Sequence, residues 1–213
     1  MRDNLGSCSL SLQDDRWYWD LNGDGEFMVK DVRNLLDEAV LPHADYPTRW
    51  VKYIPIKINI FAWKISLDRI PSKINLQKKG VSMEYNFCSI CDEDVEDISH
   101  IMFKCEMASI MHQKICRWWQ IDMNHVSSYA EWLSWFKNIH IPSKKKLMLE
   151  GVFYISWWQI WNFRNQILFG SSIPRRSTVF DDIVARSFTY VSSRCKKKFS
   201  WIDWMSNPSS IAL

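Results

Sequence analysis

Three cysteines and one histidine near the middle of the chain have the residue types and the spacing of a metal site. Cys88 and Cys91 form a Cys-x-x-Cys pair, His100 follows after eight residues, and Cys105 follows after four more. Zinc prefers four sulfur or nitrogen ligands in a tetrahedron, and a Cys-x-x-Cys turn presents two thiolates to one ion. Four protein ligands leave no open coordination position, so the spacing predicts one structural Zn²⁺ ion rather than a catalytic one.

Two other patterns suggest metal binding less strongly. His112 and Cys116 are four residues apart on one predicted helix, but Cys116 lies beside Trp118 and Trp119 and is more simply a small core residue. Residues 20–31 match much of a calcium EF-hand loop, yet the residues before them have a strand pattern rather than that of an entering helix. We therefore interpret this loop as the polar turn of a hairpin.

A basic segment precedes the zinc pattern. Residues 49–80 contain eight basic side chains and one acidic side chain, Asp68, for a local charge of +7. The candidate nucleic-acid-binding residues are Arg49, Lys52, Lys57, Lys64, Arg69, Lys73, Lys78 and Lys79. Cations neutralise phosphates, and the interleaved Trp50, Tyr53, Phe61 and Trp63 are types that stack on bases. The same pattern is equally consistent with solvated faces of amphipathic helices whose aromatic side chains are core.

Catalytic arrangements are missing from the sequence. It contains no P-loop, no GxSxG elbow, no HExxH and no dinucleotide fingerprint. The densest acidic stretch, residues 92–97, has five carboxylates in six residues and is predicted to be a solvent-facing loop of the zinc module. A mechanism with two metal ions held by several carboxylates has no evident place, so we expect no enzyme activity.

The elements that position these residues are predicted to be mostly helical. Thirteen Trp and only six Gly among 213 residues favour packed helices. Apolar periodicity predicts helices over about 57–69, 72–79, 100–120, 128–139 and 143–169, with a last one from Pro174 into the basic Arg194–Lys198 tail. A short β-hairpin is predicted near the N-terminus, with Trp17, Trp19 and Leu21 alternating in its first strand, a turn at 22–25, and Phe27 and Val29 in its second strand. A helix capped by Asp31 is predicted to follow the hairpin.

The charge is distributed unevenly and indicates three segments. Residues 1–48 carry four basic and ten acidic side chains, or −6, which leaves +9 on the remainder of a chain of net charge +3. We expect an N-terminal hairpin and helix at 1–48, a zinc-binding domain at 49–120 with its zinc module at 85–106, and a Trp-rich helical extension at 121–213. No membrane span or export signal is evident, so we expect an intracellular protein, in the nucleus or cytoplasm.

Several stretches beside the zinc ligands follow a distinctive order. They are Trp17-Tyr18-Trp19, residues 27–33, 55–64, 69–72 and 76–80, the pair Trp118-Trp119, and residues 158–165 with Phe169. Together with the zinc spacing, they resemble the reverse-transcriptase zinc-binding domain family of plant non-LTR (LINE-type) retrotransposons. The resemblance spans about residues 14–170 and departs at Met111, where the family usually has Trp.

The resemblance implies a segment C-terminal to a retrotransposon RNA-directed DNA polymerase. In that role the domain would grip template RNA or target DNA, and zinc held by Cys88, Cys91, His100 and Cys105 would be a structural clamp. The Tyr-x-Asp-Asp motif of the polymerase does not occur in the sequence, so the chain alone is not expected to copy RNA. The alternative is a zinc-stabilised scaffold that docks onto the polymerase portion of a parent polyprotein.

Overall fold

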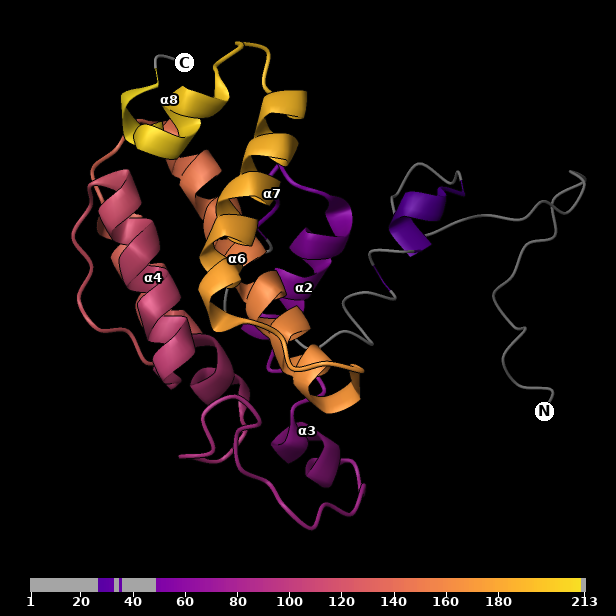
Figure 1. The fold of residues 1–213 in the computed structure, drawn as a ribbon. Coiled ribbons are helices and arrows are strands. Elements are labelled where there is room, and N and C mark those ends of the chain that lie inside the picture. The colour runs from indigo at the N-terminus through magenta and orange to yellow at the C-terminus, as the bar shows by residue number, and fades with distance from the viewer. Residues whose placement is uncertain (1–26, 33–34, 36–48, 212–213) are drawn as a thin grey trace, which may run out of the picture. The chain divides into compact units, whose positions relative to one another are not determined.

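A computed structural model describes residues 27–32, residue 35 and residues 49–211 of the chain. The chain divides into two compact units, Met1–Asp45 and Tyr46–Leu213, and each is described by itself. The ribbon in Figure 1 follows the second unit through its successive helices. None of the helices in the described ranges is both long and apolar enough to cross a membrane.

The first unit corrects one part of the predicted hairpin. Most of that hairpin, with the EF-hand-like loop beside it, lies outside the described residues, but residues 29–32 are helical. The Met28 carbonyl accepts hydrogen bonds from the backbone N–H of Asp31 at 3.0 Å and of Val32 at 3.4 Å. Val29 therefore belongs to the first turn of a helix and not to a second strand, and the helix begins before Asp31.

The second unit is helical, as the sequence predicts. Its elements are α2 (Ile56–Ser66), α3 (Lys73–Lys78), the π-turn η1 (His100–Lys104), α4 (Glu106–Trp119), α5 (Tyr129–Asn138), α6 (Ser143–Phe169), the 3₁₀ turn η2 (Arg176–Thr178), α7 (Val179–Arg194), α8 (Trp201–Ser206) and the 3₁₀ turn η3 (Pro208–Ser210). No β-strand occurs in residues 49–211, where a single isolated antiparallel bridge joins Phe87 and Val95.

Local signals account for several of these boundaries. The Ser72 hydroxyl accepts a hydrogen bond from the backbone N–H of Asn75 and caps α3, and Ser128 caps α5 through the N–H of Glu131. Gly80 adopts φ +84° just after α3, a left-handed conformation that glycine reaches without strain. These short-range contacts are the reason that the boundaries could be predicted from sequence.

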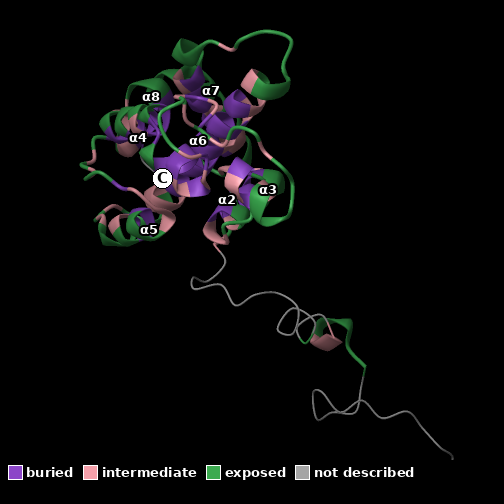
Figure 2. Cartoon of the chain, turned by 90° about the horizontal axis from the view of Figure 1, so that it is seen from below, coloured by how far each residue is buried: buried purple, intermediate pink, exposed green. Residues whose placement is uncertain are grey.

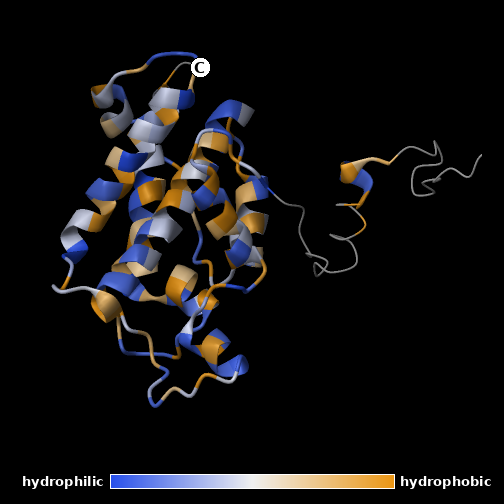
Figure 3. Ribbon diagram, turned by 90° about the vertical axis from the view of Figure 1, so that its right-hand side faces the viewer, coloured by the Kyte–Doolittle hydropathy of each residue, from blue (hydrophilic) through white to orange (hydrophobic). Residues whose placement is uncertain are grey.

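Helix α6 is the central element of the second unit. It contacts α2, α4 and α7, and Figure 2 shows its buried face among them. A helix that is apolar all round must be buried on several sides, and fifteen of the 27 residues of α6 are buried. Figure 3 shows hydrophilic and hydrophobic positions side by side along the helices. Because α6 packs on both α2 and α4, residues 49–120 and 121–211 share one core.

Tryptophan rings fill much of this core. Trp132 on α5 lies with its ring centroid 4.7 Å from Trp157 of α6 in an edge-to-face contact, and 5.0 Å from Phe136 in a stacked one. Trp119, Trp132, Trp157 and Trp204 are among the largest fully buried side chains. Edge-to-face and offset-stacked rings add about 0.5–1.5 kcal/mol per pair beyond the area they bury. Packing therefore accounts for several of the Trp side chains in the described residues.

Helix α8 and turn η3 were not predicted. Ser200 and Asp203 form a capping box, with the Ser200 hydroxyl accepting from the Asp203 N–H and the Asp203 carboxylate accepting from the Ser200 N–H. That pattern was a sequence signal for α8. The remaining stabilisation is tertiary, because the Trp118 indole N–H donates to the Trp204 carbonyl at 2.9 Å and the Trp204 side chain is fully buried.

At Gly151 the segment before α2 packs closely on α6. A Cβ at this position would lie 3.0 Å from Ile54 Cγ2 and 3.2 Å from Val51 Cγ1, and both neighbours are buried. We expect Gly151→Leu to lower the free energy of unfolding by about 1–3 kcal/mol through overpacking. Urea denaturation measures the change, with Lys144→Leu at an exposed position of the same helix as the control. Equal stability of the two variants would contradict this packing argument.

Candidate metal centre

The structure brings the four predicted metal ligands together. The ligand atoms of Cys88, Cys91, His100 and Cys105 all lie within 4.8 Å of one another, and Cys91 Sγ is 3.1 Å from His100 Nε2. Zinc bonds of 2.0–2.3 Å at tetrahedral angles place ligand atoms about 3.3–3.8 Å apart. Three thiols and one imidazole at this spacing fit a zinc ion after a small contraction, and the burial of three of them fits a structural role.

A tight loop presents the first two cysteines. The Cys88 N–H donates to the Asp94 carbonyl at 2.7 Å, and the Asp92 N–H donates back to the Cys88 carbonyl at 2.9 Å. Asp92 adopts φ 63°, a left-handed conformation that Asp tolerates better than most residues. With the Phe87–Val95 bridge, these bonds close the loop so that both thiols face the same point.

The other two ligands are brought together by a π-turn. In an α-helix, residues five apart point about 140° away from each other, since each residue turns the chain by about 100°. Here the Cys105 N–H donates to the His100 carbonyl at 2.7 Å, five residues back, and the α-helix α4 begins only at Glu106. The continuous helix predicted over 100–120 is therefore wrong at its start, and the π-turn is what places His100 and Cys105 on one side.

The protonation states of the three cysteines fit a site in which a metal ion displaces thiol protons. A hydrogen bond from the Cys105 thiol lowers the pKa of Cys88 to about 5, outweighing the effect of its burial. The pKa of Cys105 is raised, because the Cys105 thiol is hydrogen-bonded to Cys88 and because Cys105 is buried. Burial also raises the pKa of Cys91. A zinc ion bound here would replace the protons of Cys91 and Cys105, so binding would release protons at neutral pH.

A carboxylate lies behind His100, although no hydrogen bond joins it to the ring. Its Nε2 faces the cysteines, while Asp94 Oδ2 lies 3.5 Å from Nδ1. Histidine ligands of zinc commonly have a carboxylate or carbonyl on the second ring nitrogen, which fixes the tautomer. The His100 backbone is held too, since its N–H donates to Asp97 Oδ1 at 2.6 Å. Two acidic residues of the loop thus lie beside the histidine.

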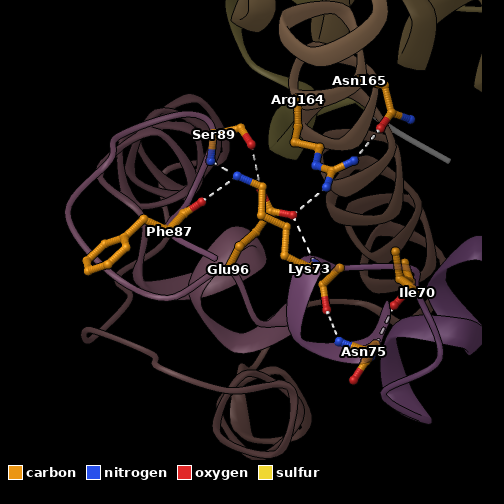
Figure 4. Close-up of polar contacts among 9 residues, drawn as sticks. Ile70, Lys73, Asn75, Phe87, Ser89, Glu96, Arg164 and Asn165 are labelled. Atoms are coloured by element: carbon orange, nitrogen blue, oxygen red, sulfur yellow. Dashed lines mark hydrogen bonds and ion pairs between the residues drawn. The ribbon is translucent and has the colours of Figure 1, made fainter. Parts of the chain in front are cut away.

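Glu96 corrects the prediction of a wholly solvent-facing acidic loop. Its side chain is 0% exposed. Figure 4 shows its carboxylate between α3, α6 and the loop of residues 88–97, which we call the zinc loop. Oε2 accepts from the Ser89 N–H at 3.1 Å and the Ser89 hydroxyl at 2.9 Å, and Oε1 accepts from the Lys73 N–H at 3.2 Å and from Arg164. The loop is therefore fixed to two helices through one buried carboxylate.

The Glu96–Arg164 ion pair determines the charge state of this carboxylate. Burial acts to raise the pKa of Glu96. The hydrogen bond and the positive charge of Arg164, together with the two hydrogen bonds from Ser89, outweigh the effect of burial, so the pKa of Glu96 is lowered. Sequence reasoning missed Arg164 as a support of the zinc loop. The available signal was the single charged side chain after Glu150 in the predicted 143–169 helix.

The eight predicted nucleic-acid-binding residues have unequal positions. Lys52, Lys57, Lys64, Arg69, Lys78 and Lys79 are exposed. Arg49 is engaged with buried Glu150, with Nε 2.5 Å from Oε1 and Nη2 2.9 Å from Oε2, and the hydrogen bond of Glu150 raises its pKa. Lys73 is 7% exposed and its ammonium donates to the Phe87 carbonyl at 2.8 Å. These two cations serve the fold, because their charged groups are already partnered.

The His112–Cys116 pair lies in the core. Trp157 Nε1 donates to His112 Nε2 at 3.2 Å, and burial lowers the pKa of His112 to about 3, so the ring is neutral. Burial raises the pKa of Cys116 to about 12. Neither residue joins the Cys3His group, which is the group of potential ligands that the described part of the chain contains.

Comparison with known proteins agrees with this geometry. Residues 27–111 match a family model described as zinc-binding in reverse transcriptase. No curated protein matches the chain. No solved structure matches it either. The matched range contains all four potential ligands, the loop that carries Glu96, and the basic segment around α2 and α3. Sequence match and ligand geometry therefore agree on a metal-binding region within residues 27–111, which is similar to the zinc-binding region of reverse transcriptase.

Proposed function

We propose that this chain is a non-catalytic nucleic-acid-binding domain, stabilised by one zinc ion and derived from the RNA-directed DNA polymerase of a plant LINE-type retrotransposon. Its ligand is template RNA or target DNA. The protein binds this ligand in the nucleus or the cytoplasm. The zinc ion supplies folding free energy, and the exposed cations of the basic segment supply contacts to phosphates. The observation that carries the proposal is a cleft between α2 and α3.

We call this the cationic cleft. It has a volume of about 510 Å³ and is lined by Trp63, Lys64, Leu67, Asp68, Arg69, Asn75, Lys78 and Lys79. Four basic side chains and one acidic side chain give it a charge of +3. The half-buried Trp63 ring forms part of the wall. Cations beside an aromatic surface are the combination with which proteins hold the backbone and bases of a single strand.

The turn between α2 and α3 gives the cationic cleft its shape. Asn75 is buried, and its amide N–H₂ donates to the carbonyls of Asp68 at 2.8 Å and Ile70 at 3.0 Å. Asp68 adopts φ 51° and its carboxylate lies 3.4 Å from the Lys78 ammonium. Lys64, Arg69 and Lys79 have no acidic partner among residues 49–211, so their charges are available to phosphates.

The alternative is the scaffold that docks onto the polymerase portion of a parent polyprotein. Exposed apolar side chains on and before α2 favour it, with Trp50 52%, Ile56 70% and Ile60 38% exposed. Such a surface would bind another protein without the salt dependence of phosphate contacts. The two functions are therefore distinguished by the response of binding to salt.

The test is fluorescence anisotropy with single-stranded RNA and duplex DNA at two or more salt concentrations. We expect the triple variant Lys64→Gln, Arg69→Gln, Lys79→Gln to weaken RNA binding at least tenfold. It should also lower the slope of log K against log salt by about 2, since each phosphate contact to a single strand contributes about 0.7.

The matched control removes the same charge elsewhere. Lys196, Lys197 and Lys198 are exposed beyond α7, and their replacement by Gln should change the affinity less than threefold. Equal losses in both triple variants would show that net charge alone drives binding. Absence of binding by the unmodified protein would overturn the proposal and favour the scaffold.

A further inference from the structure

A second cleft lies between the C-terminal half of α6 and the start of α7. It has a volume of about 400 Å³, within the range of small-ligand sites, and four of its lining residues carry side-chain amides. These are Gln159, Asn162, Asn165 and Gln166, and we call the site the amide cleft. It shares no lining residue with the cationic cleft.

The amides of this cleft have unused hydrogen-bonding capacity. Gln159 is only 7% exposed, and its Oε1 accepts from Asn162 Nδ2 at 3.3 Å. The Gln159 amide nitrogen has no hydrogen-bond partner in residues 49–211. Asn165 Oδ1 accepts from Arg164 at 3.1 Å, which leaves its N–H₂ available. A ligand that supplies an acceptor could therefore bind the amide N–H₂ groups of Gln159 and Asn165 without breaking a hydrogen bond within the protein.

Charged and aromatic groups complete the lining. Arg175 and Arg186 are exposed, and neither forms an ion pair with Asp182 or with any other acidic side chain of the described ranges. Phe169, the last residue of α6, is 79% exposed at this cleft. In a nucleotide, the face of the base can stack on an exposed aromatic ring, and the polar edge of the base can hydrogen-bond to fixed amides. The phosphate can pair with a free guanidinium group.

We infer that the amide cleft between α6 and α7 binds one nucleotide, with the base on Phe169, its polar edge on the amides of Gln159 and Asn162, and its phosphate on Arg175 or Arg186. A nucleotide satisfies all three kinds of group at once, since it carries a flat base, polar base edges and a phosphate. The nucleotide is either a free mononucleotide or an unpaired nucleotide of a bound strand.

The cleft is connected to the zinc loop through adjacent residues of α6. Asn165 contacts Arg164, and Arg164 pairs with buried Glu96 (Figure 4). The base-recognising side of the cleft is therefore held at a fixed position relative to the zinc centre. For the strand-bound source, the inference rests on the proposed function, because that strand must first bind the domain.

The experiment is photo-crosslinking of the full chain with zinc bound. The probes are 4-thiouridine monophosphate and a single-stranded RNA containing one 4-thiouridine, and mass spectrometry locates the crosslinked peptide. We expect crosslinks within residues 159–186, reduced at least fivefold by the double variant Asn162→Ala, Arg175→Gln. Crosslinking of the mononucleotide identifies a free nucleotide as ligand, and crosslinking of the RNA alone identifies an unpaired nucleotide of a strand.

Two controls keep this test separate from that of the proposed function. The cationic-cleft triple variant should retain mononucleotide crosslinking within twofold, and Phe169→Leu, at an exposed position, should reduce it without changing the thermal midpoint. Crosslinks that fall only in residues 49–80 would leave the proposed function standing and overturn the amide cleft. Undiminished crosslinking of the Asn162→Ala, Arg175→Gln variant would overturn it as well.

Discussion

Replacing Cys91 by Ser will unfold the region around residues 85–120 and destabilise the whole Tyr46–Leu213 unit. Structural zinc in small domains contributes about 10–16 kcal/mol of apparent binding free energy, and losing one of four ligands removes much of it. The centre joins the Cys88–Cys91 loop to the π-turn before α4, and α4 packs on α6. Loss of zinc therefore reaches the common core.

Zinc content and hydrogen exchange measure this effect. The unmodified protein should contain one equivalent of zinc by mass spectrometry, and a strong chelator should abolish amide protection over residues 85–120, as Cys91→Ser does. Cys195 is partly buried outside the metal centre and provides the control, because Cys195→Ser changes the same atoms without removing a ligand. Full protection of the chelated protein would refute a structural role for zinc.

Replacing Arg164 by Met will lower the free energy of unfolding by about 3–5 kcal/mol at neutral pH. The reason is Glu96, whose fully buried carboxylate would lose its only cationic partner in the described structure. Breaking one half of a buried ion pair costs this much because the remaining charge is desolvated without compensation. The exposed pair Lys78–Asp68, with side chains 63% and 58% exposed, is the control, and Lys78→Met should cost less than about 1 kcal/mol.

The pH dependence of the Arg164 variant has a definite sign. In the native protein the pKa of Glu96 is lowered, so its contribution to stability is present above the pKa of an unfolded glutamate and is lost as pH falls through the folded value. Without Arg164, burial dominates and the pKa rises. The destabilisation should then shrink from pH 7 to pH 5, because protonation removes the buried charge.

Urea denaturation at the two pH values checks both parts of this prediction. Zinc content is followed in parallel, since acid also competes with the metal for the cysteines. The double variant Arg164→Met, Glu96→Gln should regain at least half of the lost stability and lose the pH dependence. A loss of less than 1 kcal/mol in Arg164→Met would show that the zinc loop is held by other contacts.

The local sequence was sufficient for the cluster of potential metal ligands and for most helix boundaries. All four ligands lie within residues 88–105, so their spacing reflects the chemistry of one ion rather than the packing of distant elements. Helix α6 spans Ser143–Phe169, the predicted range, and is flanked by Pro142 and Gly170, which are residue types that bound helices. The cap at Ser72 and the left-handed Gly80 likewise act within a few residues.

Contacts between residues far apart decided the rest. The acidic loop looked solvent-facing because five of its six residues are carboxylates, yet Glu96 is buried by Arg164, which lies 68 positions away. Lys73 is one of the predicted nucleic-acid-binding cations, and only the tertiary structure shows that its ammonium donates to the Phe87 carbonyl. The division at residue 120 stays a prediction, and α6 packs on helices from both sides of it.

The sequence by itself determined a helical chain with a Cys3His zinc site preceded by a surplus of cations, since ligand spacing, periodicity and charge are properties of neighbouring residues. Only the tertiary structure decided which charges are buried, that a π-turn brings His100 and Cys105 together, and that amides of α6 face α7 across a cleft. The physical reason is that burial and pairing depend on what lies across the core, and periodicity indicates a buried face without indicating its partner.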